Sequence, residues 1–518
     1  MLKLPKNLAP KFRYDSKLTP AVIEIINDLL KNPVTIPNMY PTDRVQKQES
    51  PFNIRNHIAE YTHRSPQYFD DYFKNYSEIK EQWNAVPHKD KTDIFLGAAN
   101  LLETKYYDKM LAYTIAGQNK NIYEAEIDAI CELSDFLRFN VHYSDKIREK
   151  QPISSNGIQN YSEYNPLNGF IASITPFNFT AIGGNLASAP LLFGNTVLWK
   201  PSNNAILSNY LFYQIMLEAG LPKGVLNFCP QEPQTFFDKV NMRDDLGAVC
   251  FTGSSEVFDN IYRDVGNRVH SRTNYTRLIG ETGGKNFHFV DESFTPSLEF
   301  LAEETVQSAF GYSGQKCSAC SILYLPENLV DLFIKILRGK INSFMAYNSN
   351  YGLINATSFK KTLNTINKLK NDTENIRVLI DTSIEKTENY KVSPFVVKCN
   401  NHNHRVFKDE YFAPILSIYP YSTSKTDETL KLCASGNRYA LTGSVFSKRE
   451  NLVNHADKLL KAKTGNFYIN CRSTGSVVAN QPFGGSGKSG TNDKAGDMNI
   501  LYRLFNQRNI KINQTPLI

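Results

Sequence analysis

Apolar and polar positions alternate between strand-like and helix-like patterns over most of this chain. Between residues 169 and 284, short apolar runs typical of buried strands fall at 169–174, 196–200, 225–228, 248–252 and 277–280. Helical patterns separate several of these runs, at 181–193, 208–219 and 257–265. Strands that alternate with helices predict a parallel sheet with both faces covered. We therefore expect a doubly wound α/β unit in this part of the chain.

A second alternating pattern lies between residues 285 and 464. Strand-like runs fall at 287–290, 321–325, 394–398, 414–419 and 442–446, and a helical run covers 297–310. A strand at 466–470, a glycine-rich loop at 481–490 and a strand or arm at 500–513 follow. Nearer the amino terminus, the patterns predict helices at 20–31, 65–85, 90–105 and 123–142, a proline-rich connector up to residue 50, and a protruding hairpin at 151–165.

One stretch without any charged residue runs from Asn165 to Trp199 and is long enough to span a bilayer. Prolines interrupt it at positions 166, 176 and 190. An uncharged strand–loop–helix–strand run suits a sheet covered on both faces better than a membrane helix. We therefore expect no membrane contact.

The totals fit a soluble protein of several domains. A chain of 518 residues is too long for one core, and 41% hydrophobic with 21% charged residues is ordinary for globular proteins. A formal net charge of +7 without a basic block gives no reason to expect nucleic acid binding. Eight cysteines without regular spacing favour a reducing compartment, and no apolar secretory signal is visible.

The segment Gly311-Tyr312-Ser313-Gly314-Gln315-Lys316-Cys317 places a thiol after a glycine-bearing turn. Cysteine attacks as a thiolate, and its reference pKa of about 8.5 means that it needs a local field or a nearby base. Cys317 and Cys320 also form a C-x-x-C pair, which leaves a zinc or redox site as an alternative. The other cysteines are isolated, so no metal site is expected.

Further motifs follow in a fixed order. A carboxamide follows one predicted strand in Pro176-Phe177-Asn178-Phe179, and a carboxylate ends another in Gly280-Glu281-Thr282-Gly283. The remaining motifs are KPS at 200–202, FTGS at 251–254, EYFAP at 410–414 and PFGG at 482–485. With Cys317, their order and spacing resemble the aldehyde dehydrogenase superfamily along nearly the whole chain. The runs GGKNFHFV, GQKCSAC, GNFYIN and STGS are most similar to members that oxidise L-glutamate γ-semialdehyde.

The resemblance implies a cysteine-based oxidation of an aldehyde. Cys317 would attack the carbonyl carbon, and Asn178 with the backbone N–H of Cys317 would bind the oxyanion before hydride leaves to NAD. Glu281 would be the general base that hydrolyses the thioester, so the product is a free acid. Simpler interpretations exist, because a lone asparagine is often a turn former and a lone glutamate a solvated charge.

The resemblance also implies which residues hold the two reactants. Those expected around NAD are Lys200, Ser202, Gly253, Ser254, Glu410 and Phe412. Those expected around the semialdehyde are Ser318, Gly475 and Ser476 at its carboxylate, Phe179 and Phe483 along its carbon chain, and Glu126 near its ammonium group. A solvated helix face is the alternative interpretation of Glu126. Asn203 stands where the family often has an acid, which leaves NADP tolerance open.

The expected fold is α/β and aldehyde dehydrogenase-like. A Rossmann-like dinucleotide-binding domain would span 17–150 and 166–284, with 471–490 returning to it. A catalytic domain would span 285–470, and 151–165 with 491–518 would form an oligomerisation arm. Exposed strand edges on such an arm favour a homodimer.

The expected role is proline catabolism in the cytoplasm, with the mitochondrial matrix as the alternative compartment. The alternative substrate is another short semialdehyde, such as succinate semialdehyde. A binding protein without activity is the non-enzymatic alternative. It would be expected to have lost Cys317 or Glu281, and the chain has both.

Overall fold

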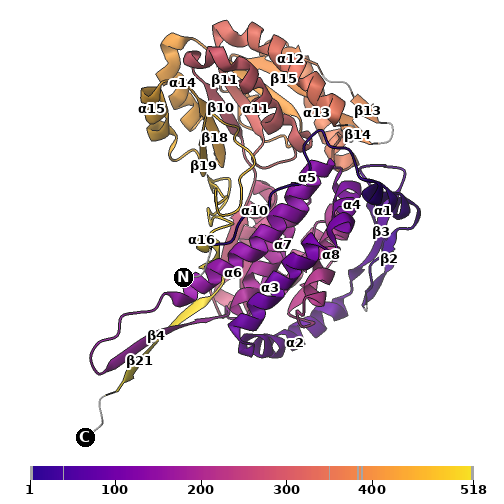
Figure 1. The fold of residues 1–518 in the computed structure, drawn as a ribbon, viewed down its shortest axis with the longest axis vertical. Helices are drawn as coiled ribbons and strands as arrows, with labels where there is room; N and C mark the ends of the chain where they lie inside the picture. Colours follow the sequence, from indigo (N-terminus) through magenta and orange to yellow (C-terminus); the bar gives the residue numbers. More distant parts are fainter. Residues whose placement is uncertain (1–3, 39, 349–350, 382–383, 387–388, 515–518) are drawn as a thin grey trace.

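Two open sheets with their helices, and a projecting two-stranded ribbon, make up the part of the chain that the structure describes. The computed structural model describes residues 4–38, 40–348, 351–381, 384–386 and 389–514. The two sheets belong to separate halves, and the ribbon extends from the half that holds the amino-terminal helices (Figure 1). No helix within these ranges has the length and apolar character needed to cross a bilayer.

The first sheet has five parallel strands in the order β7-β6-β5-β8-β9. They are β5 Phe170–Ile174, β6 Val197–Lys200, β7 Leu226–Phe228, β8 Leu246–Thr252 and β9 Arg277–Glu281. Strand order reverses between β5 and β8, so the loops after these two strands diverge at their carboxyl ends. Such a switch point is where open α/β sheets bind ligands. All five strands predicted between residues 169 and 284 are confirmed.

Side chains alternate between the two faces of this sheet, as the period of a strand requires. Ile171 packs with the helices of one face, whereas Phe170 and Ala172 pack with those of the other. The first face carries α7 Thr180–Ser188 and α8 Ile206–Glu218. The second carries α2 Pro66–Ala85, α9 Pro233–Asn241 and α10 Ser255–Asn267. Burial on both faces explains the apolar run without charges.

The second sheet has seven strands in the order β12-β15-β16-β11-β10-β18-β19, and only β12 runs antiparallel to its neighbour in this described sheet. They are β10 Asn286–Val290, β11 Cys320–Pro326, β12 Ile376–Ile380, β15 Phe395–Cys399, β16 Ile415–Tyr421, β18 Thr442–Phe446 and β19 Asn466–Ile469. One face packs on α11 Leu298–Phe310 and α12 Val330–Tyr347. The other packs on α13 Ala356–Asn371, α14 Thr426–Ser435 and α15 Glu450–Leu460.

The amino-terminal region adds a layer of helices over α7 and α8. Its elements are α1 Pro20–Lys31, α3 His88–Glu103, α4 Tyr107–Gln118, α5 Ile122–Glu126 and α6 Leu133–Glu149. Between α5 and α6 the backbone makes a π-helical turn, Ile127–Glu132. The helix predicted at 123–142 is therefore present, with an irregularity that its periodicity did not indicate.

A small sheet occupies residues that the sequence pattern assigned to a connector. It contains β1 Val34–Thr35, β2 Pro41–Glu49 and β3 His57–Arg64 in the order β1-β3-β2. Most side chains of β2 are exposed, so the strand has no apolar alternation to reveal it. The prediction of a proline-rich connector up to residue 50 is wrong at β1 and β2, and β3 lies beyond that connector.

The projecting ribbon joins two distant parts of the chain. β4 Ile158–Asn165 pairs antiparallel with β21 Asn506–Asn513, so most of its pairing comes from the carboxyl-terminal strand rather than from a hairpin within 151–165. Residues 491–505 do not extend this ribbon. The short helix α16 Met498–Leu501 packs against α6, and Phe505 packs on Phe193, so their apolar side chains are buried in the core.

Candidate active site

A strained turn between α11 and β11 presents Cys317. Tyr312 and Ser313 have φ values of +52° and +56°, and Gly314 has +68°. A side chain on Gly314 would lie 2.4 Å from the carbonyl oxygen of Ala413, so only glycine fits this close approach. The positive φ values of two residues that carry side chains mark this turn as strained, as active-site turns often are.

Cys317 and Glu281 meet at the carboxyl end of β9. The thiol sulfur lies 3.8 Å from Oε1 of Glu281, and both side chains are partly buried. Burial raises the pKa of Glu281 to about 7, and the neighbouring Lys494 ammonium lowers it only in part. Burial also raises the pKa of the Cys317 thiol well above its usual value, and the Glu281 and Glu410 carboxylates raise it further. The resting site therefore keeps the proton on sulfur, within reach of a carboxylate that titrates near neutrality.

Asn178 lies on the loop after β5, opposite the turn that carries Cys317. Its Nδ2 donates a hydrogen bond of 3.1 Å to the carbonyl oxygen of Gln315. A carboxamide has two N–H groups, so a second donor is left for a ligand. The side chain is 4% exposed, and its Oδ1 has no hydrogen-bond partner among the described residues. The structure thus brings a fixed amide donor to the loop that holds Cys317.

One cavity of about 150 Å³ opens onto the thiol and the carboxylate, and Phe179, the residue after Asn178, is on its wall. Cys317 and Glu281 line it, and so do five of the residues expected around the substrate: Phe179, Ser318, Gly475, Ser476 and Phe483. Charged side chains that the sequence reasoning did not single out also line it: Lys120, Glu124, Glu132, Lys316 and Arg472. Burial raises the pKa of Glu132 to about 8 and lowers the pKa of Lys316. An apolar wall with groups of both charges suits a small zwitterion.

The turn at 473–476 is held in place from behind. The backbone N–H of Ser473 donates to Nε2 of His288 over 3.4 Å, and its hydroxyl lies 3.1 Å from that of Ser308. Burial lowers the pKa of His288 to about 3, so its imidazole stays neutral and can accept this bond. Gly475 has a φ of +80°, which glycine adopts readily.

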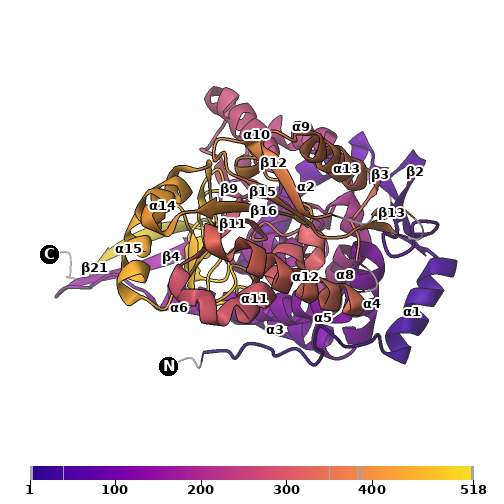
Figure 2. The same cartoon turned by 90° about the horizontal axis from the view of Figure 1, so that it is seen from above.

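The structure corrects the role expected for Glu126. Its carboxylate is buried and accepts hydrogen bonds of 2.8 Å from the backbone N–H groups of Lys11 and Phe12, and another from the Tyr107 hydroxyl. It therefore fixes the amino-terminal segment, which runs along α6 and α5 toward α1 (Figure 2), and does not face the substrate cavity. Glu126 precedes the π-helical turn and points away from the face that carries the cavity-lining positions 123 and 127. The step of five across that turn brings Glu132, followed by Phe136, to the cavity instead.

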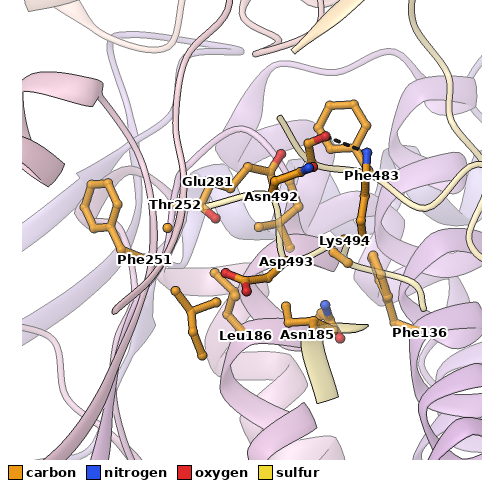
Figure 3. Close-up of a pocket in the computed structure, with 16 residues that line it drawn as sticks. Phe136, Asn185, Leu186, Phe251, Thr252, Glu281, Phe483, Asn492, Asp493 and Lys494 are labelled. Atoms are coloured by element: carbon orange, nitrogen blue, oxygen red, sulfur yellow. Dashed lines mark hydrogen bonds between the residues drawn. The ribbon is translucent and has the colours of Figure 1, made fainter. Parts of the chain in front are cut away.

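A second, smaller cavity lies behind Glu281. Figure 3 shows Glu281, Thr252, Phe483 and Lys494 on its walls. Its volume of about 30 Å³ is enough for one or two water molecules. Lys494 is fixed there by hydrogen bonds from its ammonium to the carbonyl oxygens of Gly465 and Gly484. The carboxylate of Glu281 thus borders both the thiol cavity and a space for water.

A wide cleft of about 740 Å³ lies between the two halves and contains Glu410 on its wall. The Oε1 of Glu410 accepts a 2.9 Å hydrogen bond from the backbone N–H of Gly284. A side chain on Gly283 would lie 2.0 Å from the same carboxylate, so glycine is needed there. Phe412, at a φ of +54°, packs edge-on against Phe177 with ring centroids 6.0 Å apart. This wall joins the cleft to the loop of Asn178.

Four other residues expected around a cofactor lie at or just after the carboxyl ends of β6 and β8: Lys200, Ser202, Gly253 and Ser254. Lys200 is 3% exposed, and burial lowers its pKa to about 8. The Ser254 hydroxyl caps α10 by accepting from the N–H of Val257. The N–H of Gly253 donates to the carbonyl oxygen of Glu281, so it is not available to a phosphate. Asn203 follows Ser202 in the chain. Its side-chain Oδ1 is buried and has no hydrogen-bond partner among the described residues.

The chain is similar in sequence to one protein family and to individual proteins of that family. The model of the aldehyde dehydrogenase family matches residues 41–509. The mitochondrial delta-1-pyrroline-5-carboxylate dehydrogenase of Emericella nidulans is 41% identical over 472 residues, which cover 89% of this chain and 82% of that protein. The mitochondrial enzyme of the same name from Homo sapiens is 39% identical over 485 residues, or 92% of this chain and 85% of that protein.

A solved structure agrees with the fold over the full length. The crystal structure of the delta-pyrroline-5-carboxylate dehydrogenase from Mycobacterium tuberculosis bound with NAD superposes with a TM-score of 0.92 at 34% sequence identity. The superposition covers 100% of this chain and 97% of that one. The α/β, aldehyde dehydrogenase-like fold class expected from the sequence is confirmed.

The short distance between the Cys317 thiol and the Glu281 carboxylate gives a prediction about the reactivity of the thiol. Because the Glu281 carboxylate raises the pKa of Cys317, Glu281→Gln is expected to shift the rate of iodoacetamide alkylation at Cys317 toward lower pH. The measurement is the pH at half-maximal rate, with Cys317→Ala as the control that identifies the labelled thiol. A midpoint that stays in place or moves to higher pH would contradict the assigned geometry.

Proposed function

The chain belongs to the aldehyde dehydrogenase family, and from this premise we propose that Cys317, Asn178 and Glu281 carry out the NAD-dependent oxidation of L-glutamate γ-semialdehyde to L-glutamate. The observation that carries this proposal is the thiol 3.8 Å from a carboxylate of raised pKa on the wall of a charged cavity. The reaction belongs to proline catabolism, because the semialdehyde is the open form of pyrroline-5-carboxylate.

The catalytic steps follow from the positions of these side chains. Glu281, directly or through water, takes the proton of Cys317, and the thiolate attacks the aldehyde carbon to form a thiohemiacetal. The free N–H of Asn178 and the backbone N–H of Cys317 bind the oxygen that becomes negative. NAD, when bound, accepts the hydride from this carbon, which leaves a thioester on Cys317. Glu281 then takes a proton from a water molecule that attacks the thioester, and Cys317 leaves with the release of the acid.

The cofactor is NAD, and the residues present fit it. Glu410 offers a carboxylate to ribose hydroxyls, in a cradle that Gly283 keeps free of side chains. Lys200 supplies a cation at the end of β6, and the orphaned Oδ1 of Asn203 can accept from a ribose hydroxyl. A neutral Asn203 excludes a 2′-phosphate less strongly than an acid would, so we infer some NADP tolerance. Comparison of kcat/KM for the two cofactors tests this inference.

The cavity supports the semialdehyde over a simple aldehyde. The hydroxyls of Ser318 and Ser476 and the backbone N–H groups at Gly475 and Ser476 are available for its carboxylate. Phe179 and Phe483 line the space for its carbon chain. With Glu126 committed to the amino-terminal segment, we assign the ammonium group to Glu132, which lines the cavity. Succinate semialdehyde, the alternative substrate, has no ammonium group that could pair with the Glu132 carboxylate.

The relatives and the ribbon suggest where and in what form the protein acts. Two compared relatives are named as mitochondrial enzymes, which favours the mitochondrial matrix over the cytoplasm as the compartment. A two-stranded ribbon leaves one edge of each strand unpaired, and Ile512 on β21 is 40% exposed. Such edges gain hydrogen bonds by meeting a second chain, so we propose a homodimer. Light scattering at several concentrations tests the oligomeric state.

NADH formation from pyrroline-5-carboxylate, beside succinate semialdehyde and propanal, is the direct test of the activity. We expect kcat/KM to be highest with pyrroline-5-carboxylate, because only its open form carries both charged groups that the cavity accommodates. A panel in which succinate semialdehyde leads would favour the alternative substrate.

The raised pKa of Glu281 predicts the pH dependence of turnover. A general base acts in its deprotonated form, so kcat is expected to fall as the pH drops below about 7. Glu281→Gln is expected to lose this acidic limb and to turn over about 10²–10⁴-fold more slowly. A variant that keeps both the limb and the wild-type rate would exclude Glu281 as the base.

The carboxylate site predicts a substrate-dependent effect of Ser476→Ala. Loss of one hydrogen bond to a charged carboxylate costs about 1.5 kcal/mol, which raises KM for the semialdehyde about tenfold. KM for propanal is expected to change little, because propanal has no carboxylate. Ser424→Ala, at an exposed serine after β16, is the matched control. Equal changes for the two aldehydes would argue against the assigned site.

A further inference from the structure

A buried carboxylate behind the cavity holds the loop of Asn178. Asp128, on the π-helical turn after α5, is fully buried and accepts hydrogen bonds from the backbone N–H groups of Thr180 and Ala181, at 3.0 and 2.8 Å. These two residues begin α7 and follow Asn178 and Phe179 directly. Their N–H groups have no partner within the helix, so a buried acceptor is needed there. Asp128 therefore fixes the point from which the Asn178 loop extends.

A buried lysine connects the same carboxylate to the turn of Cys317. The ammonium of Lys120 lies 2.5 Å from Oδ2 of Asp128, and the two side chains are 1% and 0% exposed. The same ammonium lies 4.2 Å from the ring centroid of Phe179 and 4.8 Å from that of Tyr312. Phe179 belongs to the Asn178 loop and Tyr312 to the strained turn before Cys317. Lys120 thus contacts both loops at once, through cation–π interactions that are strong when desolvated.

A third residue of the same segment holds that strained turn. The backbone N–H of Tyr312 donates a 2.7 Å hydrogen bond to Oε1 of Glu124. Glu124 is itself fixed by a capping box with Asn121 at the start of α5. Residues 120–128, which we call the brace, therefore contact the Asn178 loop through Asp128 and the Cys317 turn through Glu124, with Lys120 between them.

Burying the charged pair of Lys120 and Asp128 costs free energy. Removing two opposite charges from water costs several kcal/mol for each ion, and a packed apolar pair would often be as stable. What the charged pair adds is a fixed geometry, because its bonds have a direction. Asn178 has one side-chain hydrogen bond of its own, to Gln315, which leaves its position dependent on the backbone at Thr180. A displacement of about 1 Å in a catalytic group can cost about 10²-fold in rate.

We propose that Asp128, held by Lys120, is a positioning residue that sets the Asn178 amide against the oxygen of the aldehyde attacked by Cys317. It touches neither the substrate nor the cofactor. Its effect falls on the step in which the oxyanion forms, and reactions of Cys317 that form no oxyanion do not depend on it. The inference rests on the proposed oxidation, which supplies that step.

The test is Asp128→Asn, which keeps the size of the side chain but removes its charge and one of its two acceptor oxygens. In a single turnover with L-glutamate γ-semialdehyde and NAD, the rate of NADH formation is expected to fall about 10–100-fold. The half-saturating aldehyde concentration is expected to change less than about threefold, because the oxyanion forms only after binding. Alkylation of Cys317 by iodoacetamide is expected to stay within about twofold of the wild-type rate, because that displacement builds no negative oxygen.

Asp291→Asn is the matched control. Asp291 is also buried, accepts from the backbone N–H of Ser293 and pairs with Arg449, in the other half of the molecule. Both variants are expected to melt at lower temperature than the wild type, but only Asp128→Asn is expected to separate NADH formation from alkylation. Equal losses in the two reactions, or a wild-type rate of NADH formation, would overturn the inference.

A second variant covers the case in which Asp128→Asn does not fold. Asp128→Glu keeps the charge that pairs with Lys120 but moves its acceptor oxygens by one methylene group away from the N–H groups of Thr180 and Ala181, so the same separation of the two rates is expected. Parallel losses in both rates count against a positioning role of Asp128. A wild-type enzyme that forms no NADH from the semialdehyde would instead refute the proposed function, so the two failures are distinct.

Discussion

The site depends on two acidic groups, the thiol of Cys317 and the carboxylate of Glu281, which lie side by side and are partly buried. The thiol of Cys317 and the carboxylate of Glu281 lie 3.8 Å apart, and burial raises the pKa of each. In water both would be poor partners, because the glutamate would be ionised and too weak a base near neutrality. Here the buried carboxylate titrates near pH 7 and can take a proton first from sulfur and later from water. One arrangement thereby serves both halves of the reaction.

The three side chains of the proposed reaction, Glu281, Asn178 and Cys317, come from two different sheets. Glu281 ends β9 of the five-stranded sheet, and Asn178 follows β5 at the point where strand order reverses. Cys317 precedes β11 of the seven-stranded sheet, so the proposed reaction would take place where the two halves meet (Figure 1). The brace at residues 120–128 comes from a third region, the amino-terminal helices. Its contacts with both loops explain how groups from separate sheets keep one geometry.

Much of this could be predicted from residue patterns, and the exceptions have physical reasons. Buried parallel strands are apolar on both faces, so the strands around Glu281 and Asn178 were identified in place. β2 was missed because its side chains are mostly exposed. The strand that pairs with β4 lies at the far end of the chain, and only the family resemblance, which joined 151–165 and 491–518 in one arm, indicated it. Local patterns carry no information on such pairing.

The wrong prediction for Glu126 has a separate physical reason. A π-helical turn shifts one face of the helix by a residue and so brings Glu132 to the cavity, whereas Glu126 lies before that turn and holds the amino-terminal segment. Such a turn has no signature in a single sequence. The buried pair of Lys120 and Asp128 was also invisible, because two charges eight positions apart look like solvated surface until tertiary contacts bury them.

The most direct test of the central claim is the mass of the enzyme trapped between its two half-reactions. Without the Glu281 carboxylate, which raises the pKa of Cys317, the thiol of Glu281→Gln ionises at lower pH and can still attack the aldehyde. The water that hydrolyses the thioester has no base in this variant, so we expect the thioester to accumulate with semialdehyde and NAD. Intact mass spectrometry is predicted to show one added glutamyl group, located on the peptide that contains Cys317 and absent from the Cys317→Ala variant. An unmodified Cys317 at full NADH yield, or a glutamyl group on another residue, would contradict the account.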